Sequence, residues 1–315
     1  MADNWSSAAG ALQGILAFLD SELPRHAVMG LTGHAWHFCL GSRAGVVALP
    51  SGPTDFDRPA MWERYSRTGW RWERYFAAVP SGDAGAPVRE AAVEWAIERL
   101  DAGKPLIGWD FHLHEYGVVY GYDREREGFL VDDPLTGEFG DYAAWEDWPP
   151  LGEIELLAPL APSEPDPVEA VEGALRTALD CFAGKDGPDD GQPRGTEGIV
   201  AWADAFESDT EVDRAGNAYT LAVLQTARLD GAAFVADVMA ALPDLEPALS
   251  AAHRALREET KTLAPLITLF PFPTGGHGNV ANPGLRRAAA MALRRAAQYE
   301  REVAAAFEEA LRLFE

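Results

Sequence analysis

The spacing of apolar residues divides the first half of the chain into helical and strand-forming segments. Residues 6–20 begin with two serines and place apolar side chains at helical spacing, at Leu12, Ile15, Leu16 and Leu19. Residues 87–104 predict a second helix that ends at Gly103. Runs rich in strand-forming residues predict strands over residues 105–113, 116–123, 128–134 and 153–160. A helix followed by an antiparallel series of strands indicates an α+β domain.

The second half of the chain has helical spacing almost throughout. Its three longest apolar-periodic segments are residues 216–242, 245–270 and 282–315, and the first of them suits either one long helix or two. The last segment has a proline near its start, which is typical of a first helical turn. The spacing of the apolar faces predicts an all-α C-terminal bundle.

A change in composition marks the boundary between the two halves. Nine of the ten tryptophans lie before residue 150, and only Trp202 lies after it. We therefore expect an α+β domain over residues 1–161 and an α-helical domain over residues 168–315. Residues 184–198, rich in glycine, proline and charge, predict a flexible loop within the helical domain.

The net charge of −24 argues against nucleic-acid binding, because phosphates are neutralised by clustered lysine and arginine. It also disfavours docking to anionic lipid. Residues 61–76, MWERYSRTGWRWERYF, alternate aromatic and basic groups as single-stranded nucleic-acid platforms do. In so acidic a chain we expect this segment to form a partly exposed amphipathic helix, or a lid over a cleft, instead.

The cysteine content and the apolar runs bear on the compartment. Two cysteines, Cys39 and Cys181, suit a reducing environment. No apolar run approaches the roughly 20 residues of a membrane span, and no basic leader precedes the first apolar run. We expect a cytoplasmic protein without a membrane partner, and the sequence leaves its oligomeric state open.

Several short motifs carry a resemblance to a known family. The order of the first helix, GKPLIGWD, GVVYGYD and VDDP resembles the papain-like fold of the bacteriocin-processing cysteine peptidases. With MGLTGHAWHF, EYGVVYGYD and the GNAY helix added, the chain is similar to the butirosin-biosynthesis-protein-H-like family. That family has a papain-like N-terminal domain and a helical C-terminal domain. The resemblance covers most of the chain and implies a papain-like fold over residues 1–161.

The resemblance assigns candidate catalytic residues position by position. Aligning AGALQGIL places Ser7 where the family has its cysteine. Aligning GVVYGYD places Glu115 at the position of the catalytic histidine, with His114 one residue earlier. The acidic third member falls on Asp133, beside Asp132. The Cys–His–Asp set of the family therefore becomes Ser–Glu–Asp in this chain.

This exchange of residue types has chemical consequences. A thiol ionises readily beside an imidazolium, whereas a serine hydroxyl needs a general base to remove its proton. Glu115 can act as that base only if its surroundings favour the protonated carboxyl. His114 could act only if a bulge turned it to the face of Glu115, because successive side chains of a strand point in opposite directions. The alternative for Ser7 is a helix N-cap, and for Glu115 a structural carboxylate.

Two groups of residues have spacings that suit a metal ion. One comprises His34, His37 and Cys39, which need a turn to converge. The other comprises Asp110, His112 and His114, which share one face of a predicted strand. Both patterns also occur without a metal, so we assign no metal and no cofactor. For Cys39, the alternative to a role as nucleophile or ligand is a small buried apolar side chain.

Three functions remain as hypotheses. The resemblance implies acyl transfer of the secondary-metabolism type, from a small-molecule or carrier-protein-bound thioester or amide to an amine. The replacement of cysteine and histidine favours a catalytically degenerate papain-like module that binds a peptide or small metabolite. His112 and His114 support a metal-dependent hydrolase, which is the weakest of the three.

Overall fold

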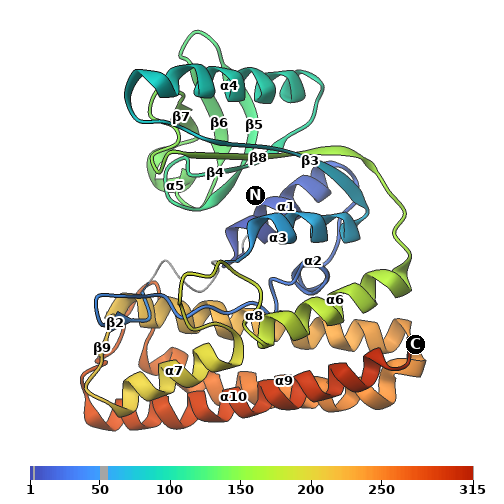
Figure 1. Cartoon of the computed structure of the whole chain (residues 1–315), viewed down its shortest axis with the longest axis vertical. Helices are drawn as coiled ribbons and strands as arrows, with labels where there is room; N and C mark the ends of the chain where they lie inside the picture. The colour runs from blue at the N-terminus through green and yellow to red at the C-terminus, as the bar shows by residue number, and fades with distance from the viewer. Residues whose placement is uncertain (3, 50–55, 315) are drawn as a thin grey trace. The chain divides into compact units, whose positions relative to one another are not determined.

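Two compact units make up the chain, and each has its own apolar core. The computed structural model describes residues 1–2, 4–49 and 56–314 (Figure 1). The sheet unit comprises residues 1–24 and 65–165, and the helical unit comprises residues 25–64 and 166–315. Residues 25–64, which we expected within the first domain, therefore belong with the helices.

A six-stranded antiparallel sheet forms the sheet unit, with the strand order β3-β8-β4-β5-β6-β7. The strands are β3 (Trp70–Ala78), β4 (Leu106–Trp109), β5 (Tyr116–Asp123), β6 (Gly128–Asp132), β7 (Tyr142–Ala144) and β8 (Glu153–Pro162). The helices are α1 (Ser7–Phe18), α4 (Ala86–Asp101) and the short α5 (Thr136–Phe139), with 3-10 turns η1 (Tyr65–Thr68) and η2 (Gly82–Gly85). The predicted α+β class and the antiparallel sheet are confirmed.

Helices α1 and α4 pack on opposite faces of this sheet. Val119 of β5 lies in the core that α4 forms with the sheet. Side chains alternate along a strand, so Tyr116 and Val118 point to the other face. There Val118 borders a small pocket with Ile15 of α1. The second half of α1 therefore lies beside β5.

The aromatic and basic segment of residues 61–76 contributes a strand to the sheet unit, so the expected amphipathic helix is wrong for its second half. Strand β3 pairs with β8 along its whole length, from Trp70 opposite Pro162 to Ala78 opposite Glu153. Half-buried and exposed side chains alternate along most of β3, which is the pattern of a strand with one solvated face.

The helical unit contains the longest helices of the described chain. Its helices are α2 (Arg25–Thr32), α3 (Arg58–Arg64), α6 (Pro167–Phe182), α7 (Gly195–Glu207), α8 (Arg214–Ala241), α9 (Glu246–Leu269) and α10 (Pro283–Leu311), with η3 (Pro243–Leu245). A small sheet joins β1 (Ser42–Arg43), β2 (Val46–Val47) and β9 (Glu211–Val212). In the described ranges, no helix combines the length and hydropathy that crossing a bilayer requires.

Capping residues fix where three of these helices begin. The side chains of Asp166, Asp213 and Asn282 accept hydrogen bonds from backbone N–H groups of the first turns of α6, α8 and α10. The segment of residues 216–242, which suited one helix or two, belongs to the single helix α8 up to Ala241, and Leu242 is its C-cap. The predicted loop of residues 184–198 is irregular up to Arg194, and its last residues start α7.

A buried ion network crosses the helical unit. The guanidinium of Arg228 in α8 donates to the carboxylate of Glu300 in α10 at 2.9 Å and lies 3.6 Å from the carboxylate of Glu259 in α9. It also donates to the carbonyl of Ala35 at 2.6 Å. All three charged side chains are fully buried, so one cation lies beside two acids. Burial and Glu300 raise the pKa of Glu259 well above its ordinary value, against the attraction of Arg228.

Candidate functional site

Ser7 is the first residue of α1, but its side chain does not cap that helix. The N-cap is Ser6, whose extended backbone (φ −91°) leads into the helix without a side-chain cap. The Ser7 hydroxyl instead donates to the carboxylate of Glu115 and accepts a hydrogen bond from the backbone N–H of Tyr116 at 3.0 Å. The structure thus brings Ser7 and Glu115 into direct contact, and the N-cap alternative for Ser7 does not apply.

A tight loop between β4 and β5 positions Glu115. The backbone N–H of Asp110 donates to the carbonyl of Glu115 at 3.0 Å, and the N–H of Glu115 donates to the carbonyl of Leu113 at 2.7 Å. Asp110 has a φ of 68°, a conformation that ends the strand at Trp109. The predicted strand over residues 105–113 is therefore too long.

His114 forms a hydrogen-bonded pair with Asp110. Its Nδ1 lies 2.6 Å from Asp110 Oδ1, and Asp110 Oδ2 accepts the backbone N–H of Leu151 at 2.8 Å. Asp110 is fully buried, whereas 54% of the His114 side chain is exposed. Among the described residues, none bonds to Nε2 of His114. A buried carboxylate thus orients an imidazole that has one nitrogen open to solvent, an arrangement that suits proton transfer.

His112 forms a second pair, with Asp133. Its Nδ1 lies 2.9 Å from Asp133 Oδ2, and its Nε2 lies 3.1 Å from the carbonyl oxygen of Tyr142. Both ring nitrogens therefore face acceptors, so His112 positions the loop and has no open nitrogen for a substrate. Asp133 also accepts the backbone N–H of Leu135 at 2.9 Å. Its hydrogen bonds within the described chain go to His112, Leu135 and Thr136, and not to Glu115 or His114.

The sequence analysis missed a buried carboxylate that bonds to the side chain of Tyr116, the residue whose backbone N–H donates to Ser7. Glu155 of β8 accepts the hydroxyl proton of Tyr116 at 2.8 Å and pairs with Arg74 of β3 at 2.5 Å. Glu155 is fully buried, and together with burial its charge raises the pKa of Tyr65 well above the ordinary value. The available signal was Glu155 itself, which stands between the apolar residues Ile154 and Leu156 of strand β8.

The structure does not form either of the two metal-binding groups suggested by the sequence, His34 with His37 and Cys39, or Asp110 with His112 and His114. His112 and His114 bond to two different aspartates and lie in a loop, so the shared strand face with Asp110 is not formed. In the helical unit, His37 lies near Cys181 and Asp186, and not with Cys39.

The fit of the His37 cluster to a metal is poor. Arg64 donates to both oxygens of Asp186, at 2.8 and 3.0 Å, and so occupies the lone pairs that a cation would need. Burial raises the pKa of the Cys181 thiol, which disfavours the thiolate that binds metals. We therefore interpret these residues as a neutralised buried cluster.

The side chains of the sheet unit are arranged for proton transfer from a hydroxyl to a carboxylate, which needs no metal. A hydroxyl at a helix N-terminus touches a carboxylate that can accept its proton, and the preceding loop carries a half-exposed histidine oriented by Asp110. Of the four candidate residues, Ser7 and Glu115 meet, whereas His114 and Asp133 each belong to a separate pair. No protein-family model matches this chain, and no curated protein matches it in sequence.

Proposed function

We propose that the sheet unit is a papain-like domain that transfers an acyl group from a thioester or amide to an amine. The observation that carries the proposal is the hydrogen bond from Ser7, at the start of α1, to Glu115, at the start of β5. A nucleophile at a helix N-terminus beside a base on the facing sheet is the arrangement that the papain-like resemblance leads us to expect.

The chemistry takes place in two steps. The Ser7 oxygen attacks the acyl carbon, its proton passes to Glu115, and Glu115 then protonates the departing group, which is a thiolate from a thioester or an amine from an amide. In the second step, the amine attacks the Ser7 ester, its proton passes to Glu115, and Glu115 protonates the Ser7 oxygen as the ester bond breaks. Backbone N–H groups in the first turn of α1 are suited to stabilise the negative oxygen of each tetrahedral intermediate.

His114 supplies a second route for the proton. Its open Nε2 and its buried partner Asp110 suit it to accept the proton of the incoming amine. In this proposal Asp133 acts through His112, and it positions the loop that carries Glu115.

A second candidate function is favoured by the burial of the nucleophile. Only 4% of Ser7 is exposed, and its oxygen already takes part in two hydrogen bonds. Such a group suits a degenerate papain-like module, in which the former catalytic pair ties the helix to the sheet while the domain binds a peptide or small metabolite.

One experiment separates the two functions. The protein is incubated with an N-acetylcysteamine thioester and a primary amine, and thiol release and amide formation are measured together with the intact mass. Acyl transfer predicts an acyl adduct on wild-type protein that is lost in Ser7→Ala and slowed in Glu115→Gln. The matched control is Ser81→Ala, because Ser81 is exposed and its side chain makes no capping hydrogen bond.

The outcomes distinguish the candidates. Equal turnover in wild type, Ser7→Ala and Glu115→Gln would contradict the assignment of Ser7 as nucleophile and Glu115 as base. Absence of both turnover and adduct, with the thioester still bound, favours the binding module. Slowing in His114→Gln alone moves the role of base from Glu115 to His114.

A further inference from the structure

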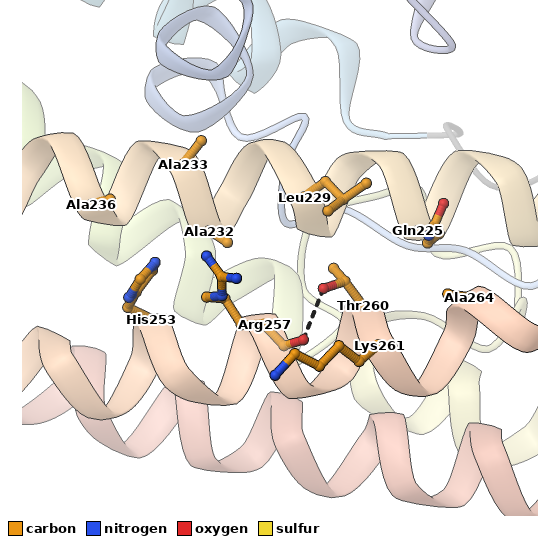
Figure 2. A pocket seen from close by; sticks show the side chains of 10 residues that line it. All are labelled: Gln225, Leu229, Ala232, Ala233, Ala236, His253, Arg257, Thr260, Lys261 and Ala264. Atoms are coloured by element: carbon orange, nitrogen blue, oxygen red, sulfur yellow. Dashed lines mark hydrogen bonds between the residues drawn. The ribbon is translucent and has the colours of Figure 1, made fainter.

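A groove between α8 and α9 of the helical unit has no acidic residue in its lining. Its volume is about 470 Å³, within the usual range for small-molecule sites. It is lined by Gln225, Leu229, Ala232, Ala233, Ala236, His253, Arg257, Thr260, Lys261 and Ala264 (Figure 2). None of these residues is acidic, although the chain carries a net charge of −24.

The two helices contribute different walls. Helix α8 presents three alanines and Leu229, and the small alanine side chains leave the space that makes the groove. Helix α9 presents His253, Arg257 and Lys261, which lie one above another because they are four residues apart. Figure 2 shows His253 and Arg257 directed from α9 toward α8. One wall is therefore apolar and the other basic.

The basic wall retains an uncompensated positive charge. Lys261 pairs with Glu258 at 2.5 Å, but among the described residues no carboxylate pairs with the Arg257 guanidinium. Burial and the nearby Arg257 lower the pKa of His253. Leu229 on the opposite wall is 46% exposed, so the apolar side of the groove is also uncovered.

We propose that this groove binds a small amphiphilic anion, with its carboxylate or phosphate head at Arg257 and His253 and its apolar body along the alanines of α8. Charge complementarity selects this occupant: a guanidinium forms paired hydrogen bonds with planar or tetrahedral oxyanions. The apolar wall adds burial that inorganic anions cannot use. This site is independent of the acyl-transfer proposal, since it uses none of the residues of the sheet unit.

The test uses octyl phosphate as the probe and isothermal titration calorimetry of the full chain. We expect octyl phosphate and octanoate to bind, and octan-1-ol, octylammonium and inorganic phosphate to bind at least about tenfold more weakly. The comparison of octyl phosphate with octanoate distinguishes a phosphate ester from a carboxylic acid as the preferred head group.

Matched variants locate the site. Arg257→Gln is expected to weaken octyl phosphate binding about tenfold or more. Arg254→Gln removes the same charge from an exposed position of the same helix outside the groove, and it should leave binding unchanged. Ala236→Leu, which fills the groove, should weaken binding of octyl phosphate and octanoate alike. Circular dichroism and thermal melting establish that each variant is folded.

Three results would overturn the proposal. The first is octyl phosphate binding that Arg257→Gln and Arg254→Gln reduce equally, which indicates only a general effect of charge. The second is octylammonium binding as tightly as octyl phosphate, which indicates a purely apolar surface. The third is no detectable binding of either anion to the folded wild-type protein.

Discussion

The Ser7 hydroxyl donates to the carboxylate of Glu115, while the backbone N–H of the next residue, Tyr116, donates to the Ser7 oxygen at 3.0 Å. One side chain thus joins the first residue of α1 to the beginning of β5. Ser7 is buried, so whatever its role in chemistry, it satisfies a carboxylate and a backbone donor at the helix–sheet junction.

Ser7→Ala is therefore expected to lower the free energy of unfolding by about 1–3 kcal/mol, because it removes the hydrogen bonds that the buried Ser7 hydroxyl makes with a carboxylate and a backbone N–H. Urea unfolding monitored by tryptophan fluorescence measures the change. The exposed Ser81→Ala should stay within about 0.5 kcal/mol of wild type. Equal stability of the two variants would contradict this account of Ser7.

Asp110 is expected to matter more for stability than its partner His114. Asp110→Ala removes the acceptor of the Leu151 N–H and places alanine at a φ of 68°, so it should cost about 2 kcal/mol or more. His114→Ala removes only a half-exposed partner and should cost less than about 1 kcal/mol. Asp110→Asn, which tolerates this backbone and can still accept the N–H, should fall between them. The reverse order in urea unfolding would show that the loop does not depend on Asp110.

Glu259 is expected to make the helical unit less stable as the pH rises. Burial and Glu300 raise the pKa of Glu259 in the folded protein, so the folded chain holds a proton that the unfolded chain releases near the ordinary value of 4.5. The stability from that proton is fully present below this ordinary value and is lost as the pH rises toward the raised one.

Glu259→Gln cannot titrate, so it lacks this pH-dependent loss. Above pH 4.5 the free energy of unfolding of the variant should therefore rise relative to that of wild type, by up to about 1.4 kcal/mol per pH unit. Urea unfolding at a series of pH values measures the difference between the two proteins. The control is Glu309→Gln, an exposed position of α10, which should follow the wild-type curve. A constant difference between Glu259→Gln and wild type from pH 4 to 8 would mean that Glu259 titrates normally.

Gly30 in α2 tests how closely that helix packs on α8. A Cβ at this position would overlap the ring of Phe234. Gly30→Ala should therefore destabilise the protein by about 1–2 kcal/mol, although alanine favours a helix by up to about 1 kcal/mol. Gly137→Ala in α5 has open space around its Cβ and should be neutral or slightly stabilising. Thermal unfolding compares the two, and a more stable Gly30→Ala would show that Phe234 moves aside at little cost.

The sequence predicted the elements whose patterns are local. Helices α1 and α4 and the strands β5, β6 and β8 lie where the apolar spacing places them, because their periodicity reflects one buried face. Strand β3 was missed because its alternating aromatic and basic residues were interpreted as an amphipathic helix.

The contact between Ser7 and Glu115 was expected from the resemblance, but the partners of the neighbouring residues were not. Asp110, with its positive φ, ends β4 early and removes the alternation on which the faces of His112 and His114 were assigned. A single positive φ, such as that of Asp110, does not alter the periodic pattern of apolar residues in the sequence. The pairing of His112 with Asp133 depends on that turn and could not be predicted.

Residues 25–64 show a further limit of sequence reasoning. Their tryptophans and their position placed them in the first domain, but their packing partners are far along the chain. Trp36 packs edge-on against Phe234 and Phe307, and Ala35 accepts a hydrogen bond from Arg228, 193 residues away. Composition cannot reveal contacts over such a separation.

That long separation governs the order in which the protein can assemble on the ribosome. Trp36 leaves the exit tunnel well before Phe234 is synthesised, so this apolar segment has no native cover while the strands of the sheet unit are being made. The helical unit can fold completely only when residues 25–64, which are synthesised before most of the sheet unit, pack against the later helices. A nascent chain stalled before α8 should accordingly expose this tryptophan to chaperones.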